Sequence, residues 1–151
     1  MNTHNEDLYN KINDLRNAFS DKKYKISELE LDIKNIQEKM LDLKRVYCDE
    51  WFAKNRTNYF KLVKYGETFY EYYITNIRQY PNKHGYTLCG CRVEKVTDSV
   101  SKIEPGIDTE YDINKFYELI TNGHTDKIYK IEVDDIMSVV DNFAHRILRR
   151  Y

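Results

Sequence analysis

The chain has 151 residues, of which 41% are hydrophobic and 32% are charged, and its formal net charge is −1 at pH 7. This composition excludes wholesale disorder and a membrane-protein composition, and the near-neutral charge removes the broad attraction that most nucleic-acid binders exert on phosphates. The N-terminal residues lack the basic start and apolar run of a signal peptide, and no stretch of about 18 consecutive apolar residues occurs. We therefore expect a cytoplasmic protein.

A heptad repeat of apolar residues runs from Leu8 to Tyr47, with Lys22 as its one polar interruption. With Ile12 at position a, the a positions are Ile12, Phe19, Ile26, Ile33, Met40 and Tyr47, and the d positions are Leu8, Leu15, Lys22, Leu29, Ile36 and Leu43. No Gly or Pro precedes Gly66, so an unbroken helix is allowed. Such a seam must be buried against a partner, and we expect residues 1–50 to form a coiled-coil helix that makes the protein a homodimer.

The orientation of the two helices in this dimer stays open. Branched residues at a and mostly Leu at d favour a parallel two-stranded coiled coil. In a parallel pair Lys25 would face Glu30 favourably. Lys11 would however face Arg16, and Lys39 would face Lys44, and both of these contacts are repulsive.

A helical hairpin broken near residues 20–26 is the competing interpretation of this segment, because Ser27 and Glu30 form a capping-box pattern. The heptad register continues across the supposed break, which favours the continuous helix. Leu31 and Leu41 lie away from the seam, so we also expect the second half of the helix to pack on the globular domain of its own chain.

Residues 51–151 change in pattern and predict a small α+β domain, either an antiparallel sheet or an SH3-like barrel. Three aromatic and β-branched runs separated by turn residues predict a meander with strands at Thr57–Lys64, Thr68–Arg78 and Tyr86–Val96. We expect a loop at Ser99–Thr109, where Pro105-Gly106 resembles a turn, and then a short helix capped by Asp112. A strand at Lys127–Val133 and a C-terminal helix capped by Asp134 or Asp135 follow.

The second predicted strand carries the densest group of aromatic residues in the chain. Strict alternation places Phe69, Tyr73 and Ile77 on one face and Tyr70, Tyr72 and Ile74 on the other. One face is expected to fill the core, while the other could display tyrosines to a partner. With the basic residues on or beside the strands, the candidate partner-binding residues are Tyr70, Tyr72, Lys61, Lys64, Arg78 and Arg92.

The sequence gives no reason to expect a metal site or catalysis. Cys89 and Cys91 could ligate a metal together with Cys48, His84 or His145, but structural zinc sites use paired C-x-x-C spacing, and buried thiols are the expected outcome. No P-loop, dinucleotide fingerprint, H-E-x-x-H or G-x-S-x-G motif is present. We expect no cofactor and no enzymatic activity.

These observations predict a non-enzymatic binding protein that dimerises through its helix and engages another protein through its aromatic-rich β domain. The many Lys, Asn and Ile residues are compatible with an AT-rich genome, and a phage-encoded inhibitor of a host defence protein, of the anti-CRISPR type, is one narrower hypothesis. The alternatives are a single-stranded nucleic-acid binder that uses basic and aromatic residues of the sheet, and a small-molecule (nucleotide) binder with its site between helix and sheet.

Overall fold

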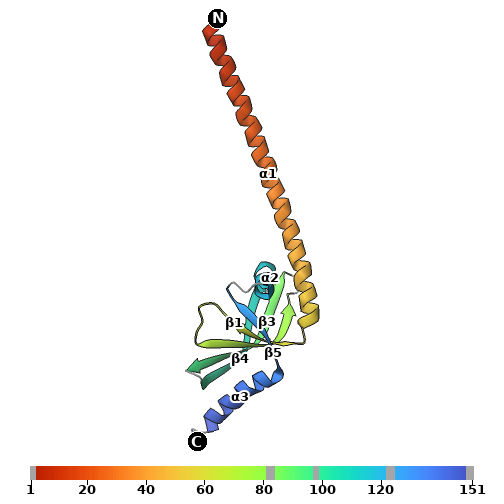
Figure 1. The fold of residues 1–151 in the computed structure, drawn as a ribbon, viewed down its shortest axis with the longest axis vertical. Coiled ribbons are helices and arrows are strands. Elements are labelled where there is room, and N and C mark those ends of the chain that lie inside the picture. The colour runs from red at the N-terminus through yellow and green to blue at the C-terminus, as the bar shows by residue number, and fades with distance from the viewer. Residues whose placement is uncertain (1–2, 81–83, 97–98, 122–124, 149–151) are drawn as a thin grey trace. The chain divides into compact units, whose positions relative to one another are not determined.

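A computed structural model describes residues 3–80, 84–96, 99–121 and 125–148, with side chains up to residue 144 (Figure 1). Its elements are α1 (Thr3–Asn55), β1 (Tyr59–Val63), β2 (Tyr70–Gln79), β3 (Gly85–Val96), β4 (Ser99–Asp112), α2 (Ile113–Thr121), β5 (Lys127–Ile131) and α3 (Val133–Leu148). Contacts within the chain divide it into two compact units, residues 1–42 and residues 43–151. The boundary between the two units lies inside α1.

The first unit consists of α1 residues alone. The helix is continuous from Thr3 to Asn55, which confirms the uninterrupted helix and shows that the hairpin alternative was wrong. The predicted dimer-interface residues are all exposed, at between 49% and 71%: Ile12, Leu15, Phe19, Ile26, Leu29, Ile33, Ile36, Met40 and Leu43. Leu31, on the other side of the helix, is 58% exposed. Pairing with a second helix remains a prediction.

The second unit is built on an open antiparallel sheet with strand order β4-β3-β2-β1-β5. Strands β1 to β4 follow one another as a meander, which confirms the predicted antiparallel pairing of the first three. Strand β5 returns to pair with β1 at the other edge. Since β4 and β5 are both edges, the sheet does not close into the SH3-like barrel that was the other expectation.

Strand β4 occupies the segment that the sequence predicted to be a loop. Pro105 pairs with Cys91 and Ile107 with Gly90, so Gly106, at φ +72°, is an extra residue in a bulge. Because β4 is an edge strand, the missing N–H of Pro105 and the bulge cost no interior ladder bonds. The Pro-Gly pair therefore bends a long strand and does not end it.

A second irregularity lies in β2, where the register shifts between Ile74 and Asn76. Ile74 pairs with Gly90 and Ile77 with Leu88, so Ile77 shares the face of Ile74. The expected placement of Ile77 beside Tyr73 was wrong, because the bulge adds one residue and reverses the alternation. Gly90 is required here, since a Cβ atom would lie 1.8 Å from the backbone oxygen of Tyr73.

The end of α1 and helix α2 cover one face of the sheet with an aromatic cluster. The ring of Tyr86 stacks on Phe116 with centroids 4.2 Å apart, and Trp51 lies 5.4 Å from Phe60 and 5.5 Å from Phe116. Tyr86 also donates its hydroxyl proton to Asp49 of α1. These contacts fix the last turns of α1 on the sheet.

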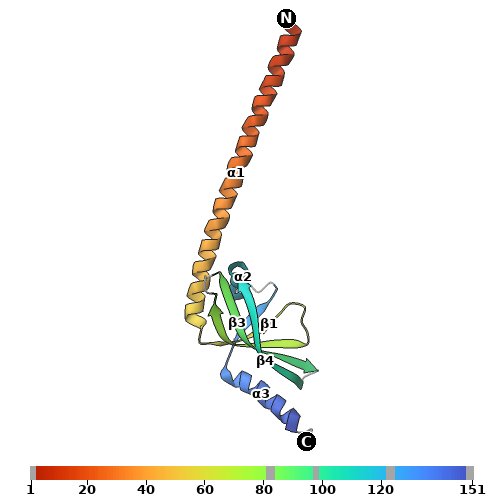
Figure 2. The same ribbon diagram turned by 180° about the vertical axis from the view of Figure 1, so that it is seen from behind.

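Helix α3 covers part of the opposite face (Figures 1 and 2). Its Ile136, Val139 and Phe143 pack against a buried group that includes Tyr73 and Val93. Among the helices that the structure describes, none is long and apolar enough to cross a membrane.

The predicted N-terminal cap is confirmed for α2 but not for α3. Asp112 accepts the backbone N–H of Lys115 at 2.8 Å, which confirms it as the cap of α2. Helix α3 begins at Val133, one residue before the predicted caps. Glu132 is its N-terminal flank, and Asp135 reaches back to accept the Glu132 N–H at 2.8 Å, so Asp135 belongs to the first turn.

We expect Phe116→Ala to lower the free energy of unfolding by about 3–5 kcal/mol, because the cavity would lie between Tyr86 and Trp51. Phe69→Ala is the matched control, since Phe69 is 68% exposed, and its effect should stay within about 0.5 kcal/mol. Urea unfolding followed by circular dichroism measures both. Equal effects of the two substitutions would contradict this account of the core.

Candidate functional site

The largest unpartnered surface is the α1 seam, defined as the apolar a and d residues from Leu8 to Tyr47. Between Leu8 and Leu43 no described side chain from outside α1 covers it, whereas the ring of Tyr47 contacts that of Tyr117 in α2 with centroids 5.3 Å apart. The apolar members of the seam range from 45% exposed at Leu8 to 71% at Leu15 and Leu43. Folded monomers seldom leave contiguous apolar patches of more than a few hundred Å² in water. The seam therefore has the properties of an interaction surface.

Charged residues flank the seam along its whole length. Lys23 places its ammonium 5.0 Å from the centre of the Phe19 ring, so its aliphatic stem extends the apolar strip. Lys11, next to Ile12 at the border of the seam, forms an ion pair with Asp7 at 3.6 Å. The seam is thus apolar at its centre and charged at its borders, as in coiled coils.

A second candidate surface lies on the sheet, where four of the six predicted partner-binding residues come together. These four, Lys64, Tyr70, Tyr72 and Arg92, are named here the tyrosine–basic cluster. The guanidinium of Arg92 lies 4.5 Å from the centre of the Tyr70 ring, and the ammonium of Lys64 lies 4.3 Å from that of Tyr72. Strand β2 supplies both tyrosines, and β3 supplies Arg92.

Members of the tyrosine–basic cluster differ in accessibility. Tyr72 is only 4% exposed, and its hydroxyl donates to the carboxylate of Glu67. Burial, reinforced by that carboxylate, raises the pKa of Tyr72 to about 12. Tyr70 and Arg92 are half-buried, and Arg92 also pairs with Glu104. Tyr72 therefore supports the cluster from below, while Tyr70 and Arg92 form its accessible part.

The other two predicted residues lie elsewhere. Lys61 pairs with Tyr73 across β1 and β2, on the opposite face from Tyr72, and forms an ion pair with Glu71 at 3.0 Å. Arg78 lies near the other end of β2, with its guanidinium 3.4 Å from Asp108. One surface containing all six residues is therefore not formed.

A carboxylate network around Glu71 was not predicted from the sequence. Glu71 accepts bonds from Lys95 at 2.8 Å, Lys61 at 3.0 Å and the Tyr73 hydroxyl at 2.9 Å. Burial raises the pKa of Glu71, but these hydrogen bonds lower it more, so that the pKa lies below its ordinary value of 4.5. The network fixes β2 between β1 and β3 and neutralises two lysines that would otherwise attract phosphate.

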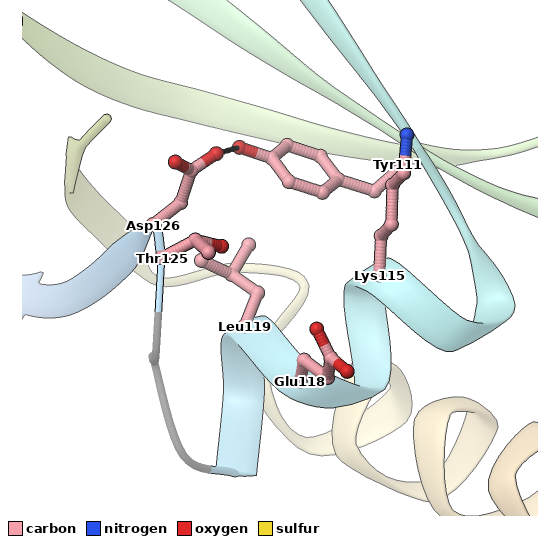
Figure 3. A pocket seen from close by; sticks show the side chains of 6 residues that line it. All are labelled: Tyr111, Lys115, Glu118, Leu119, Thr125 and Asp126. Carbon is pink, nitrogen blue, oxygen red and sulfur yellow. Dashed lines mark hydrogen bonds between the residues drawn. The ribbon is translucent and has the colours of Figure 1, made fainter. Parts of the chain in front are cut away.

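A pocket of about 330 Å³ lies between α2 and the start of β5 (Figure 3). Its lining is Tyr111, Lys115, Glu118, Leu119, Thr125 and Asp126. Asp126 accepts the Tyr111 hydroxyl at 2.6 Å and the backbone N–H of Tyr65 at 3.0 Å. Burial and this carboxylate raise the pKa of Tyr111. Two carboxylates against one lysine do not suit an anionic phosphate, so the pocket offers little to a nucleotide.

The three thiols lie in different environments. Cys48 is fully buried beside the backbone oxygen of Ile113, and burial raises its pKa to about 11. Cys91 packs with Tyr73 in the core beneath α3, whereas Cys89 lies 3.3 Å from the guanidinium of Arg78. In the part of the chain that the structure describes, which leaves out the side chain of His145, no group of three or more His, Cys, Asp or Glu residues could hold a metal ion.

No protein-family model, curated protein or solved structure matches the chain. The case for any function consequently rests on the residues and geometry of the chain itself.

We expect Glu71→Gln to destabilise the protein by about 1–3 kcal/mol at neutral pH, because charged hydrogen bonds are lost. A carboxylate with a depressed pKa stabilises the fold above its unfolded pKa, and this stabilisation is lost as the pH falls through the folded pKa. The gap between wild type and variant should therefore be constant above pH 4.5 and shrink below it. Urea unfolding at several pH values measures the gap.

Asp108→Asn serves as the control for this experiment. Asp108 pairs with Arg78 at the surface, with side chains 52% and 60% exposed, so the cost should be about 0–1 kcal/mol. A gap between wild type and Glu71→Gln that persists unchanged at pH 3 would contradict the assigned role of Glu71.

Proposed function

We propose that this chain is a non-enzymatic, intracellular binding protein that works as a homodimer held together by the α1 seam. One observation carries the proposal: a continuous helix exposes a heptad repeat of apolar side chains that, from Leu8 to Leu43, no described residue outside the helix covers. The tyrosine–basic cluster of the second unit then serves as the contact surface for a different protein.

The physical reason for dimerisation is the cost of leaving the α1 seam in water. Burying a Leu or Ile side chain fully is worth about 1.5–3 kcal/mol, and most helical stability in proteins comes from packing an apolar face. The seam repeats such residues over eleven apolar positions, ending at Tyr47. A second copy of α1 supplies the same spacing of knobs and holes, and so can bury the seam along its length.

Protein binding is favoured over nucleic-acid binding by the partners of the basic residues. Lys61 pairs with Glu71, Arg78 with Asp108 and Arg92 with Glu104. A phosphate backbone would have to compete with these carboxylates. Tyr70, stacked beneath Arg92, instead offers a rigid aromatic surface with a charged border, which is typical of the anchoring residues of protein interfaces.

Leu29→Glu should convert the dimer to a monomer, because the glutamate would enter the centre of the seam in both copies. Leu31→Glu is a close control: the two leucines are 60% and 58% exposed, but Leu31 lies on the outer side of the helix. Light scattering during gel filtration should give twice the chain mass of 18.3 kDa for wild type and Leu31→Glu, and 18.3 kDa for Leu29→Glu. A monomeric wild type would refute the proposal.

The contact surface is tested by affinity capture from nuclease-treated lysate of the source cells. We expect a protein captured by wild type to be lost with Tyr70→Ala/Arg92→Ala and retained with Tyr129→Ala, which alters a tyrosine 50% exposed on β5. Capture of a host defence protein would support the narrower hypothesis of a phage inhibitor. Salt-sensitive binding of labelled single-stranded DNA or RNA, lost on Lys61→Ala/Lys64→Ala/Arg92→Ala, would favour the nucleic-acid alternative instead.

A further inference from the structure

We propose that the two copies of α1 pair in antiparallel orientation, in the register that places Ile26 of one copy opposite Leu29 of the other. This inference rests on the homodimer proposed above and specifies which surface each copy presents to the other. Along the pair, the layers would join Ile12 with Leu43, Phe19 with Ile36, Ile26 with Leu29, Ile33 with Lys22, Met40 with Leu15, and Tyr47 with Leu8.

The position of the symmetry axis favours this register. An antiparallel homodimer has a two-fold axis perpendicular to its helices, so residues equidistant from the axis on either side face each other. The midpoint of the α1 seam lies between Ser27 and Glu28, and the proposed register centres the axis there. Every seam residue from Leu8 to Tyr47 then faces a seam residue of the other copy. Any other antiparallel register leaves one end of the seam unpaired.

The symmetric register requires α1 to be continuous through its centre. Residues 20–26 are helical and belong to one element that runs from Thr3 to Asn55. A break at this point would displace the two halves of the seam and destroy the symmetric register. Exposure of both Ile26, at 56%, and Leu29, at 60%, leaves the central layer free for the second copy.

Charges at the centre of the pair are complementary in the same register. In an antiparallel pair the g positions of one helix run beside the g positions of the other, and the e positions run beside e. Along the helix axis, the proposed register places Lys23 close to Glu30 of the second copy and Lys25 close to Asp32 of the second copy. Each pair occurs twice by symmetry. All four side chains are exposed, and none forms an ion pair with another described residue.

Neighbouring registers lose this complementarity. A shift by one heptad in one direction places Lys23 beside Lys23 of the second copy, and Lys25 beside Lys25. A shift by one heptad in the other direction places Glu30 beside Glu30 of the second copy, and Asp32 beside Asp32. Like charges in such positions repel one another, so the central charges select one antiparallel register against both of its neighbours.

Lys22, the polar residue within the seam, also favours antiparallel pairing. In a parallel dimer both copies of Lys22 would occupy the same layer, and their ammonium groups would repel each other. The antiparallel pair separates them and places each beside Ile33. It also removes the repulsive contacts between Lys11 and Arg16 and between Lys39 and Lys44 that a parallel pair would contain.

The orientation has a consequence for the partner. Leu43 of each copy lies beside Ile12 of the other, so the two copies of Leu43 are about 46 Å apart along the pair. The two globular units are therefore attached at opposite ends of the paired segment. A partner that engages both copies must therefore contact two globular units whose points of attachment are this far apart along the pair.

Cysteine cross-linking of the full chain tests the proposal. In a background with Cys89→Ser and Cys91→Ser, leaving the buried Cys48 in place, we would compare Leu15→Cys, Met40→Cys and the double variant with a short bismaleimide. Light scattering first establishes that each variant is a dimer. We expect a covalent dimer from the double variant only, because Leu15 faces Met40, whereas the two copies of Leu15 are roughly 37 Å apart.

The outcomes separate the two proposals. A covalent dimer from either single variant would show parallel helices, and a light-scattering dimer without any cross-link would show another register; both overturn this inference and leave the homodimer standing. A wild-type chain that is monomeric by light scattering would overturn the proposed function itself.

Charge exchange provides an independent measurement. Glu30→Lys should raise the dimer dissociation constant about tenfold, because two attractive pairs become repulsive. Lys23→Glu/Glu30→Lys should restore the affinity, whereas Lys25→Glu/Glu30→Lys, which has the same net charge, should weaken the dimer further. Rescue by the second double variant in place of the first would demonstrate the parallel pair.

Discussion

The architecture depends on the fact that α1 carries two apolar surfaces and its own chain can bury only one. The last turns of the helix place Trp51 and Phe52 against the rings of Phe116, Phe60 and Tyr86, and this contact joins helix, sheet and α2 into one unit. Among the described residues, the α1 seam has no comparable cover from Leu8 to Leu43. Folding of the second unit therefore anchors a helix whose remaining apolar face is exposed to solvent, and we propose that a second copy of the chain covers this face.

The acidic residues in and beside the sheet are engaged within the second unit itself. Glu71, Asp126 and Glu67 are each engaged by tyrosine hydroxyls, and Glu71 also neutralises two lysines. The Glu71 network joins β2 to its neighbours, whereas Asp126 connects the segment before β5 to Tyr111 of β4, at the opposite edge of the sheet. By pairing with two lysines, Glu71 keeps the sheet from acting as a simple basic surface. The accessible part of the tyrosine–basic cluster is the stacked pair of Tyr70 and Arg92. The proposed dimer would present this pair twice, which would strengthen binding to a partner.

The elements that were predicted correctly are those with a regular pattern of apolar residues. The heptad repeat predicted the continuous helix, and alternating aromatic runs predicted the first three strands. Local irregularity caused the errors: Pro105-Gly106 was interpreted as a turn because a bulged edge strand has the same residues, and the β2 bulge moved Ile77 to the other face. All four members of the tyrosine–basic cluster were among the six predicted residues, but Lys61 lies on the opposite face of the sheet from Tyr72 and Arg78 lies near the other end of β2. Glu71 and Asp126 gave no sequence signal, because most of their partners lie ten or more residues away along the chain and are brought close only by the fold.

The central claim is that the α1 seam is buried by a second copy of the chain, and native-state amide hydrogen exchange tests it most directly. A solitary helix with an exposed apolar face opens readily, whereas a paired helix is protected to nearly the free energy of dissociation. We predict slow exchange throughout residues 8–42 at micromolar concentration, with protection that falls on dilution. Fast exchange across these residues while the sheet stays protected would contradict the account.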